Sequence, residues 1–589
     1  MRAWNLGNTT VRSPFRLRDG LRVLVNSDLH GNLIGKSRQQ EFARLLAENA
    51  VVAALRLKED GNLDASDLGR KWHGALVKMG FITPKLSNTV NEQGVDPRLR
   101  DLVSDIPSLT GRPFEITPHG QRLLDADSLA AQQELFLRSL VALQMPSPVE
   151  KLFHGKTAFS PLRIVLEILD GLERQGLEAS LSFEEIRYIV QFVMAMTEIP
   201  ACVEDVARFR RNRAKAASKP RFDQEYEKTI EPSLENQSLE TTADYADSNL
   251  RYLKATGLFL AKGRGITIAP PRYPLIRQLL AAPFTAMDGP VFLRTLWVGT
   301  PLPTDEPDQA REAITTIADA LRASGETVEL PFLPALGAQE LQQELLILNE
   351  RYELALERAY ASRQEMEWRD IVGYLVKLRA LRKREGPYIP REMAPVYFEW
   401  AVWRAFLAID SLINQPWEAR KFKFSSVEEA PISGAPSGAP DMLFEFERYV
   451  LVVEVTLTQG SRQEAAEGEP VRRHVANVVE AFADTGKPVL GLFIAHEIDT
   501  NTAHTFQQRI WYGQNDRAIR VDIVPLTLAQ FTTLFEFAFN ANGVLLPDVI
   551  LNLCLSCLEN AGATPAEWKQ KISARVESLI SDLAQAQQG

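Results

Sequence analysis

The segment PDMLFEFERYVLVVEVT, residues 440–456, constrains the fold of this chain more than any other stretch. Two short apolar runs flank the polar pair Glu447 and Arg448, a pattern that predicts an antiparallel hairpin with its turn at that pair. Pairing outward from this turn places Asp441 opposite Glu454, at about 5 Å between their Cβ atoms. A slightly shifted register is also compatible, because Glu-Arg is not a standard two-residue turn, and it keeps the two acids close.

Two facing carboxylates in a half-buried hairpin need a physical explanation. Like charges so close repel, which raises one pKa or requires a counter-ion. Mg²⁺ prefers oxygen ligands and keeps several waters, so Asp441 and Glu454 are predicted to hold Mg²⁺ in a hydrolytic site. The structural alternative is that Asp441 caps the strand and Glu454 pairs with an arginine.

Two further acids favour the metal site. Glu399 falls on the apolar stripe of a predicted helix in MAPVYFEWAVWRAFLAIDSL, where an unpaired carboxylate is costly. Glu467 follows the second strand closely in AAEGEPVRRH and is within reach of the same pocket. Arg473 and His474 are predicted either to contact the cleaved strand or balance the acids, or else to cap the following helix.

The order of these motifs resembles the core of the PD-(D/E)xK nucleases. A helix with an acid, Pro-Asp, a hairpin, Glu-x-Thr, a helix and a strand follow one another between residues 394 and 495. One departure is that Thr456 stands where these nucleases usually have lysine, two residues after the second acid.

Over nearly the whole chain, the sequence resembles the AlwI-like type IIS restriction endonucleases, a family that includes site-specific nicking enzymes. The resemblance is carried by motifs in the predicted nuclease region and by landmarks before it: Phe398 to Trp400, Pro440 to Met442, Glu454 to Thr456, Glu467 to His474, VRSP at 11–14, EFARLLA at 41–47, RFRRNR at 208–213 and RYLKATGLFLAKG at 251–263. It implies double-stranded DNA as substrate, recognition of a short asymmetric sequence, and Mg²⁺-dependent cleavage at a fixed distance outside it. The implied catalytic residues are Glu399, Asp441, Glu454 and Glu467.

The predicted fold class is multi-domain α+β, because 589 residues exceed what a single core supports. Two winged-helix-like DNA-recognition subdomains are expected at 1–145 and 146–285, the second with a hairpin around Gly263-Arg264-Gly265 and a helix capped by Thr241 or Thr242. Charged helical sequence over 286–386 predicts a helical linker domain. Apolar strands alternating with helices over 387–589 predict an α/β nuclease domain with a mixed sheet.

A net charge of −10 argues weakly against binding to nucleic acid. The stretch RFRRNRAKAASKPR at 208–221 has the opposite charge, with seven basic residues and no acid. We expect phosphate contacts from Arg208, Arg210, Arg211, Arg213 and Lys215. The alternative is a solvated helix face.

The three cysteines form neither a disulfide framework nor a zinc site, and Cys554 and Cys557 are expected in the core. No signal peptide or membrane segment is predicted, so the expected location is the cytoplasm. Expected partners are DNA, a transient homodimer or second subunit during cleavage, and a cognate DNA methyltransferase.

Three other functions remain open at this point: a strand-specific nicking endonuclease, a DNA-binding protein with an inactive nuclease domain, and a metal-dependent hydrolase of another substrate. The last predicts no salt-sensitive DNA affinity.

Overall fold

The computed structural model describes residues 1–33, 35–49, 51–52, 65–83, 114–147, 156–381, 386–409, 411–436, 438–513, 516–540 and 547–586. The chain divides into two compact units, Met1–Ala355 and Leu356–Gly589. In these described ranges, no helix is long and apolar enough to cross a membrane.

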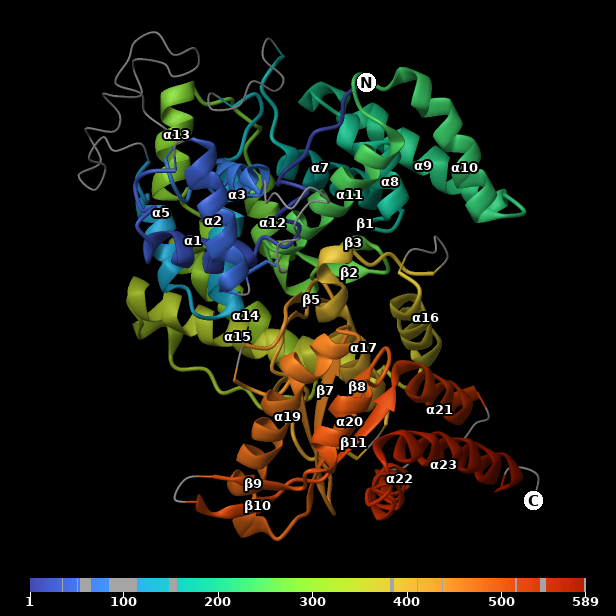
Figure 1. Ribbon diagram of the computed structural model, residues 1–589. Coiled ribbons are helices and arrows are strands. Elements are labelled where there is room, and N and C mark those ends of the chain that lie inside the picture. The colour runs from blue at the N-terminus through green and yellow to red at the C-terminus, as the bar shows by residue number, and fades with distance from the viewer. Residues whose placement is uncertain are drawn as a thin grey trace. The chain divides into compact units, whose positions relative to one another are not determined.

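The first unit opens with a group of helices (Figure 1). Ile82 and Ile116 form an antiparallel bridge between α3 and α5, and Thr117 caps α5 by accepting a hydrogen bond from the Gly120 N–H. The predicted order of helix, strand, strand and helix is present here, although the strands shrink to a single bridge. The helices are α1 (Arg16–Val25), α2 (Lys36–Glu48), α3 (Ser66–Lys78), α5 (Pro118–Asp125) and α6 (Leu129–Ala142).

A three-stranded sheet of order β1-β3-β2 follows in the same unit. Lys262 pairs with Gly265, so the predicted hairpin turns at Gly263 and Arg264. The predicted cap of the preceding helix is wrong: Ser238 caps it by accepting from the Thr241 N–H, since the helix begins earlier than expected. The elements are α7 (Pro161–Arg174), β1 (Ser180–Leu181), α8 (Phe183–Tyr188), α9 (Ile199–Lys215), α10 (Lys219–Ile230), α11 (Leu239–Lys254), β2 (Phe259–Lys262) and β3 (Gly265–Ile268).

The predicted linker region is helical. It contains α13 (Gly289–Val298), α14 (Pro307–Ala323), α15 (Ala338–Ser362) and α16 (Trp368–Arg379), after α12 (Tyr273–Leu280). Ile314, Ile317 and Leu321 of α14 form a small core with Leu341 and Leu348 of α15. The boundary between the two compact units falls inside α15, and the four-domain division stays a prediction.

The second unit is built on a mixed four-stranded sheet, as predicted. Its order is β11-β8-β7-β6, with β6 antiparallel to β7 and with β7, β8 and β11 parallel. These strands span β6 (Met442–Glu445), β7 (Val450–Thr456), β8 (Val489–Ala495) and β11 (Ile523–Thr527). A separate pair, β4 (Lys423–Ser425) and β5 (Ala430–Ser433), precedes them, after the short helix α18 (Pro416–Ala419).

Helices cover both faces of this sheet. Phe406 of α17 (Ala394–Leu407) stacks on Phe444 of β6 and on Phe531 of α21 (Leu528–Asn540). On the other face, Phe506 of α20 (Thr500–Gln507) meets Phe493 of β8. Because Glu454 pairs laterally with Phe493, its side chain lies on this second face.

Three sequence predictions in the second unit need correction. The helix expected to start near Arg473 is α19 (Ser461–Ala481), which begins earlier and therefore includes Glu467. The residues expected to continue a helix after Gln507 form strand β9 (Ile510–Tyr512). The single strand expected after it is two strands, β10 (Ala518–Arg520) paired with β9, and β11 in the main sheet. Cys554 and Cys557 are buried on α22 (Pro547–Glu559), as predicted, before the last helix α23 (Pro565–Ala586).

Candidate active site

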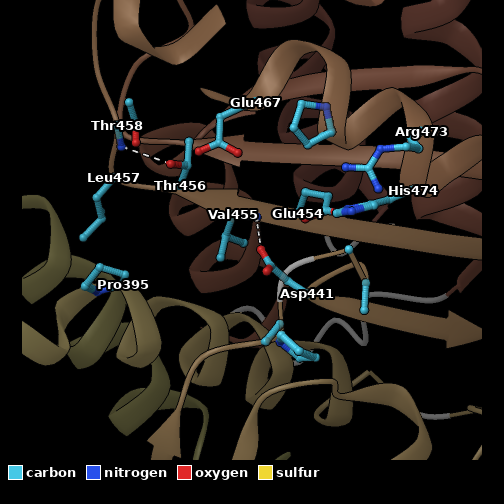
Figure 2. A pocket seen from close by; sticks show the side chains of 15 residues that line it. Pro395, Asp441, Glu454, Val455, Thr456, Leu457, Thr458, Glu467, Arg473 and His474 are labelled. Carbon is cyan, nitrogen blue, oxygen red and sulfur yellow. Dashed lines mark hydrogen bonds and ion pairs between the residues drawn. The ribbon is translucent and has the colours of Figure 1, made fainter. Parts of the chain in front are cut away.

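The hairpin β6–β7 brings the two predicted acids together. The pairs Met442 with Val453 and Glu445 with Val450 set the register, which continues to Asp441 opposite Glu454. This is the predicted register, with its turn at Glu447 and Arg448. Oδ2 of Asp441 accepts a hydrogen bond of 2.8 Å from the Val455 N–H, which orients the carboxylate beside the strand (Figure 2).

A pocket of about 530 Å³ opens over these acids at the carboxyl end of β7 (Figure 2). Its walls come from the hairpin, from the start of α17, from the loop before β6, from the segment after β7 and from α19. The lining residues are Pro395, Ala435, Pro436, Gly438, Ala439, Asp441, Glu454, Val455, Thr456, Leu457, Thr458, Glu467, Pro470, Arg473 and His474. The pocket therefore collects three of the four predicted catalytic acids: Asp441, Glu454 and Glu467.

Burial sets the electrostatics of this site. It raises the pKa of Asp441 well above its ordinary value, and the charge of Glu454 raises this pKa further. Burial also raises the pKa of Glu454 to about 8, with the charges of Glu467 and Glu399 acting in the same direction. The pKa of Glu467 is raised by burial and lowered in part by a hydrogen bond with Thr456. The site thus concentrates buried carboxylates whose hydrogen bonds offset only part of the cost of ionisation.

Glu399 lies behind the pocket wall. It sits on α17, is 8% exposed, and accepts a hydrogen bond of 2.9 Å from the Ala435 N–H through Oε2. Burial raises its pKa well above the ordinary value, and the charge of Asp441 adds to the effect. A Cβ atom on Gly434 would lie 2.9 Å from Oε1 of Glu399. Glu399 therefore anchors the loop before β6 and interacts electrostatically with Asp441.

His474 joins the site from α19. Its Nδ1 atom lies 2.7 Å from Oε1 of Glu454, and both side chains are buried. Its Nε2 atom is buried without a hydrogen-bond partner among the described residues. The sequence placed His474 near the acids without assigning it this partner. The signal was the spacing from Glu467, because seven residues are two helical turns and put both side chains on one face.

Arg473 has a different partner. It lines the pocket, and its Nε donates to Oε1 of Glu469 one turn earlier on α19, at 2.9 Å.

Thr456, at the usual lysine position, accepts a hydrogen bond of 3.1 Å from the Thr458 N–H. None of the described residues that line this pocket is a lysine. The polar side chains in the described lining are Asp441, Glu454, Thr456, Thr458, Glu467, Arg473 and His474.

The acids suit a hard cation. In the described residues, no group of three or more His, Cys, Asp or Glu side chains is arranged to hold a metal ion. Two facing carboxylates, Asp441 and Glu454, nevertheless present oxygen donors to an open pocket, and burial raises the pKa of both. Mg²⁺ is commonly held by one or two carboxylates plus waters and phosphate oxygens, so this donor set fits it.

The predicted DNA-binding residues lie on α9 of the first unit. Arg210 donates to Glu185 at 2.8 Å, and Arg213 forms two hydrogen bonds of 2.7 Å with Asp223. Arg208 pairs with Asp205 one turn earlier on the helix. Arg211 and Lys215 are exposed. The basic stretch therefore divides into cations that pair within the protein and cations that face solvent.

Comparison with known proteins identifies the class of enzyme. The chain belongs to the AlwI restriction endonuclease family, whose sequence model matches residues 77–534. All four predicted catalytic acids lie within the matched region. The protein is therefore a restriction endonuclease, a hydrolase of DNA.

Comparison with solved structures gives matches to two restriction endonucleases. The small subunit (R.BspD6I2) of the heterodimeric restriction endonuclease R.BspD6I is 22% identical, over 36% of this chain and 98% of that one, with a TM-score of 0.28. Restriction endonuclease FokI is 13% identical, over 93% of this chain and 98% of that one, with a TM-score of 0.25. Both TM-scores are too low to support a common fold. No curated protein matches the chain.

Proposed function

We propose that this protein is a type IIS restriction endonuclease that binds a short asymmetric DNA sequence and hydrolyses phosphodiester bonds at a fixed distance outside it, using Mg²⁺. The observation that carries the proposal is the pair Asp441 and Glu454, which face each other across the hairpin and open into an acidic pocket. A buried pair of carboxylates with raised pKa values is costly to a fold that does not use it.

In this proposal the side chains of the pocket have distinct roles. Asp441 and Glu454 hold the cation, and the Val455 N–H and His474 fix the directions of their carboxylates. When bound, Mg²⁺ supplies a water of lowered pKa and stabilises negative charge on the phosphate. Glu467 orients water at the pocket wall, and Glu399 holds the loop that closes the opposite wall.

The absence of a lysine leaves the positioning of the attacking water to other groups. When Nδ1–H of His474 donates to Glu454, its Nε2 atom carries a free lone pair in the pocket wall. This atom accepts a hydrogen bond from water or from a substrate group. We assign His474 a positioning role on this basis.

DNA binding is assigned to the first unit. Arg208, Arg210, Arg211, Arg213 and Lys215 form a basic stretch on a chain of net charge −10, which supports a role in contacting phosphates. The enzyme is assigned to the cytoplasm, with a cognate methyltransferase that protects the host DNA from cleavage.

The number of DNA strands that are cut depends on how many protein chains assemble on the DNA. The hairpin supplies one set of acids per chain, so double-strand cleavage needs a transient homodimer, a second subunit or two successive events. A nicking endonuclease uses the same acids on one strand only.

The test is incubation of the protein with supercoiled plasmid and MgCl₂, beside the Glu454→Ala variant, followed by mapping of the ends on both strands. Ends at a fixed distance from one short motif are expected, and breaks confined to one strand identify a nicking enzyme. Equal inactivity of wild type and variant on plasmids that cover all short motifs would overturn the proposal.

A further inference from the structure

In the subdomain predicted to be a winged helix, the helix expected to read DNA is covered. In folds of the helix-turn-helix type, a recognition helix enters the major groove. Here α11, which directly precedes the β2–β3 hairpin, holds the corresponding position. Most residues of α11 from Ala246 onward are buried, among them Asn249, Leu250 and Leu253.

The cover is the chain's own amino-terminal segment, residues 1–12. The Leu6 N–H donates to Oδ1 of Asn249 at 2.7 Å, and Nδ2 of Asn249 donates to the carbonyl of Trp4 at 3.1 Å. Farther along, the hydroxyl of Tyr252 donates to the carbonyl of Val11. These contacts run along the helix and pair the side chains of Asn249 and Tyr252, so this face of α11 is unavailable to a groove.

The charge of α11 also opposes contact with phosphate. Asp244 and Asp247 lie one turn apart, and both pair with the guanidinium of Arg12, at 2.9 and 3.1 Å. Arg251 donates to Asp247 as well. Glu240, in the first turn, is exposed. An acidic, internally paired helix is poorly suited to approach the DNA backbone.

A second feature of the same unit, the connected end of helices α9 and α10, carries positive charge. Helices α9 and α10 lie side by side as an antiparallel pair (Figure 1), and Phe209 packs edge-to-face on Phe222 and Tyr226 between them. The paired hydrogen bonds from Arg213 to Asp223 fasten the two helices near their connection. The connecting end of this pair is therefore held in place by both packing and a bidentate ion pair.

Unpaired positive charge gathers at that end. Arg211 and Lys215 lie four residues apart on α9 and thus share a face, and Lys219 begins α10. All three are exposed, and none has a partner among the residues that the structure describes. No acid occurs from residue 206 to residue 222. We call Arg211, Lys215 and Lys219 the basic tip.

We propose that this unit contacts the DNA backbone through the basic tip and not through α11. The inference rests on the proposed function, because it takes duplex DNA as the partner. Among the residues predicted to contact phosphate, it keeps only the exposed cations that pair with no other described side chain. Arg213 fastens α9 to α10, whereas Arg210 fastens α9 to α8 through Glu185. The amino-terminal segment fixes α11 as part of the core.

The first test removes the charge of the basic tip. The variant Arg211→Gln, Lys215→Gln, Lys219→Gln keeps helix-compatible side chains, and the control Lys36→Gln, Lys228→Gln, Arg277→Gln removes equal charge at other exposed positions of the same unit. Affinity for cognate duplex is measured as a function of salt concentration. The tip variant is expected to bind about tenfold or more weakly near 0.1 M salt, with a salt slope reduced by about 0.9 for each phosphate that it no longer neutralises.

The salt slope separates this inference from the proposed function. Wild-type cleavage with an unchanged slope in the tip variant overturns the basic tip and leaves the endonuclease assignment standing. An equal effect of the control variant also overturns it, because the effect then reflects total charge. A wild type that neither binds nor cleaves DNA overturns the proposed function itself.

The second test compares the two surfaces directly. The native cysteines Cys202, Cys554 and Cys557 are buried, so a maleimide reports on introduced cysteines. Cognate DNA is expected to slow labelling of Lys215→Cys severalfold and to leave Glu240→Cys on α11 unchanged. Protection of Glu240→Cys, or no protection of Lys215→Cys at saturating DNA, contradicts the proposal.

Discussion

His474 Nδ1 and Glu454 Oε1 lie 2.7 Å apart, which couples helix α19 to strand β7 at the centre of the acidic pocket. The hydrogen bond joins two side chains that are 20 residues apart in the chain. It restrains the Glu454 side chain in a site where no lysine lines the pocket. Hydrogen bonds of this kind to a ligating carboxylate commonly set its orientation.

Removal of this hydrogen bond should reduce catalysis more than DNA binding. His474→Ala is expected to lower kcat about 10- to 100-fold, the usual cost of losing such an orienting partner. His474→Asn keeps an N–H donor near the position of Nδ1 and should recover part of the activity. Single-turnover cleavage and DNA affinity are measured in parallel. Equal impairment of both variants would show that the hydrogen bond to Glu454 is not the relevant interaction.

Glu454→Gln should abolish cleavage while the fold and DNA affinity persist. The amide still accepts from His474 but supplies no charge for a cation, so we expect a loss of at least about 10³-fold in cleavage rate. Plasmid cleavage and a binding assay in the same buffer provide the readout. The exposed variant Glu447→Gln, in the hairpin turn, serves as the control with unchanged activity.

The stability of the metal-free protein should fall as pH rises. The pKa of Glu454 is about 8 in the folded chain against an ordinary value of 4.5, so the unfolded chain releases this proton first. The unfolded state therefore binds fewer protons between these two values, and unfolding becomes easier by up to about 1.4 kcal/mol per pH unit for this group. Below about 4.5 and above about 8 its contribution is constant.

Chemical denaturation in EDTA across this pH range provides the measurement. Because Asp441 and Glu399 have pKa values raised in the same direction, they add to the slope. Glu454→Gln should flatten the slope and stabilise the metal-free protein above pH 8 by about 2 to 4 kcal/mol. A slope that the substitution leaves unchanged would assign the pH dependence to other groups.

Addition of Mg²⁺ should offset the same repulsion. Binding to the folded state alone raises stability in proportion to RT ln(1 + [Mg²⁺]/Kd). We expect Mg²⁺ to raise the Tm of the wild type at pH 8 and to have little effect on the double variant Asp441→Asn, Glu454→Gln. EDTA should abolish cleavage, and excess Mg²⁺ should restore it. An equal shift in Tm for wild type and double variant would place the ion elsewhere.

Substitution of Gly434 should lower catalysis by displacing Glu399. A methyl group at this position would lie 2.9 Å from Oε1 of Glu399, so Gly434→Ala must displace that carboxylate or the loop before β6. A shift of this size beside reacting groups is expected to lower kcat about 10- to 100-fold. Gly562→Ala, where a Cβ meets no atom within 4 Å, is the matched control. Wild-type kinetics for Gly434→Ala would show that the position of Glu399 is not critical.

The hairpin was predictable from the sequence because its information is local. Alternating apolar residues and a short turn define one pairing, and a slip of one residue would turn the core side chains outward. The register from Asp441 to Glu454 was therefore confirmed. The buried position of Glu399 followed equally from helical periodicity on α17.

Interactions between distant segments left no such pattern. The partner of His474 depends on how α19 packs against β7, which no local periodicity specifies. The pairing of Arg210 with Glu185 and of Arg213 with Asp223 likewise depends on tertiary packing. From the sequence alone, all the basic residues of this stretch were therefore assigned the same phosphate-binding role. The strand β9 was mistaken for a continuation of α20 because three residues are too few to distinguish the hydrophobic periodicity of a strand from that of a helix.

The docking of residues 1–12 on α11 has a consequence for biosynthesis. Leu6 and Asn249 are 243 residues apart, so Leu6 has no partner on α11 until the intervening chain has been synthesised. Such a high contact order makes this step slow relative to local helix formation. We expect the contacts between residues 1–12 and α11 to form only after α11 has been synthesised, while the hairpin that carries Asp441 and Glu454 still lies far along the chain.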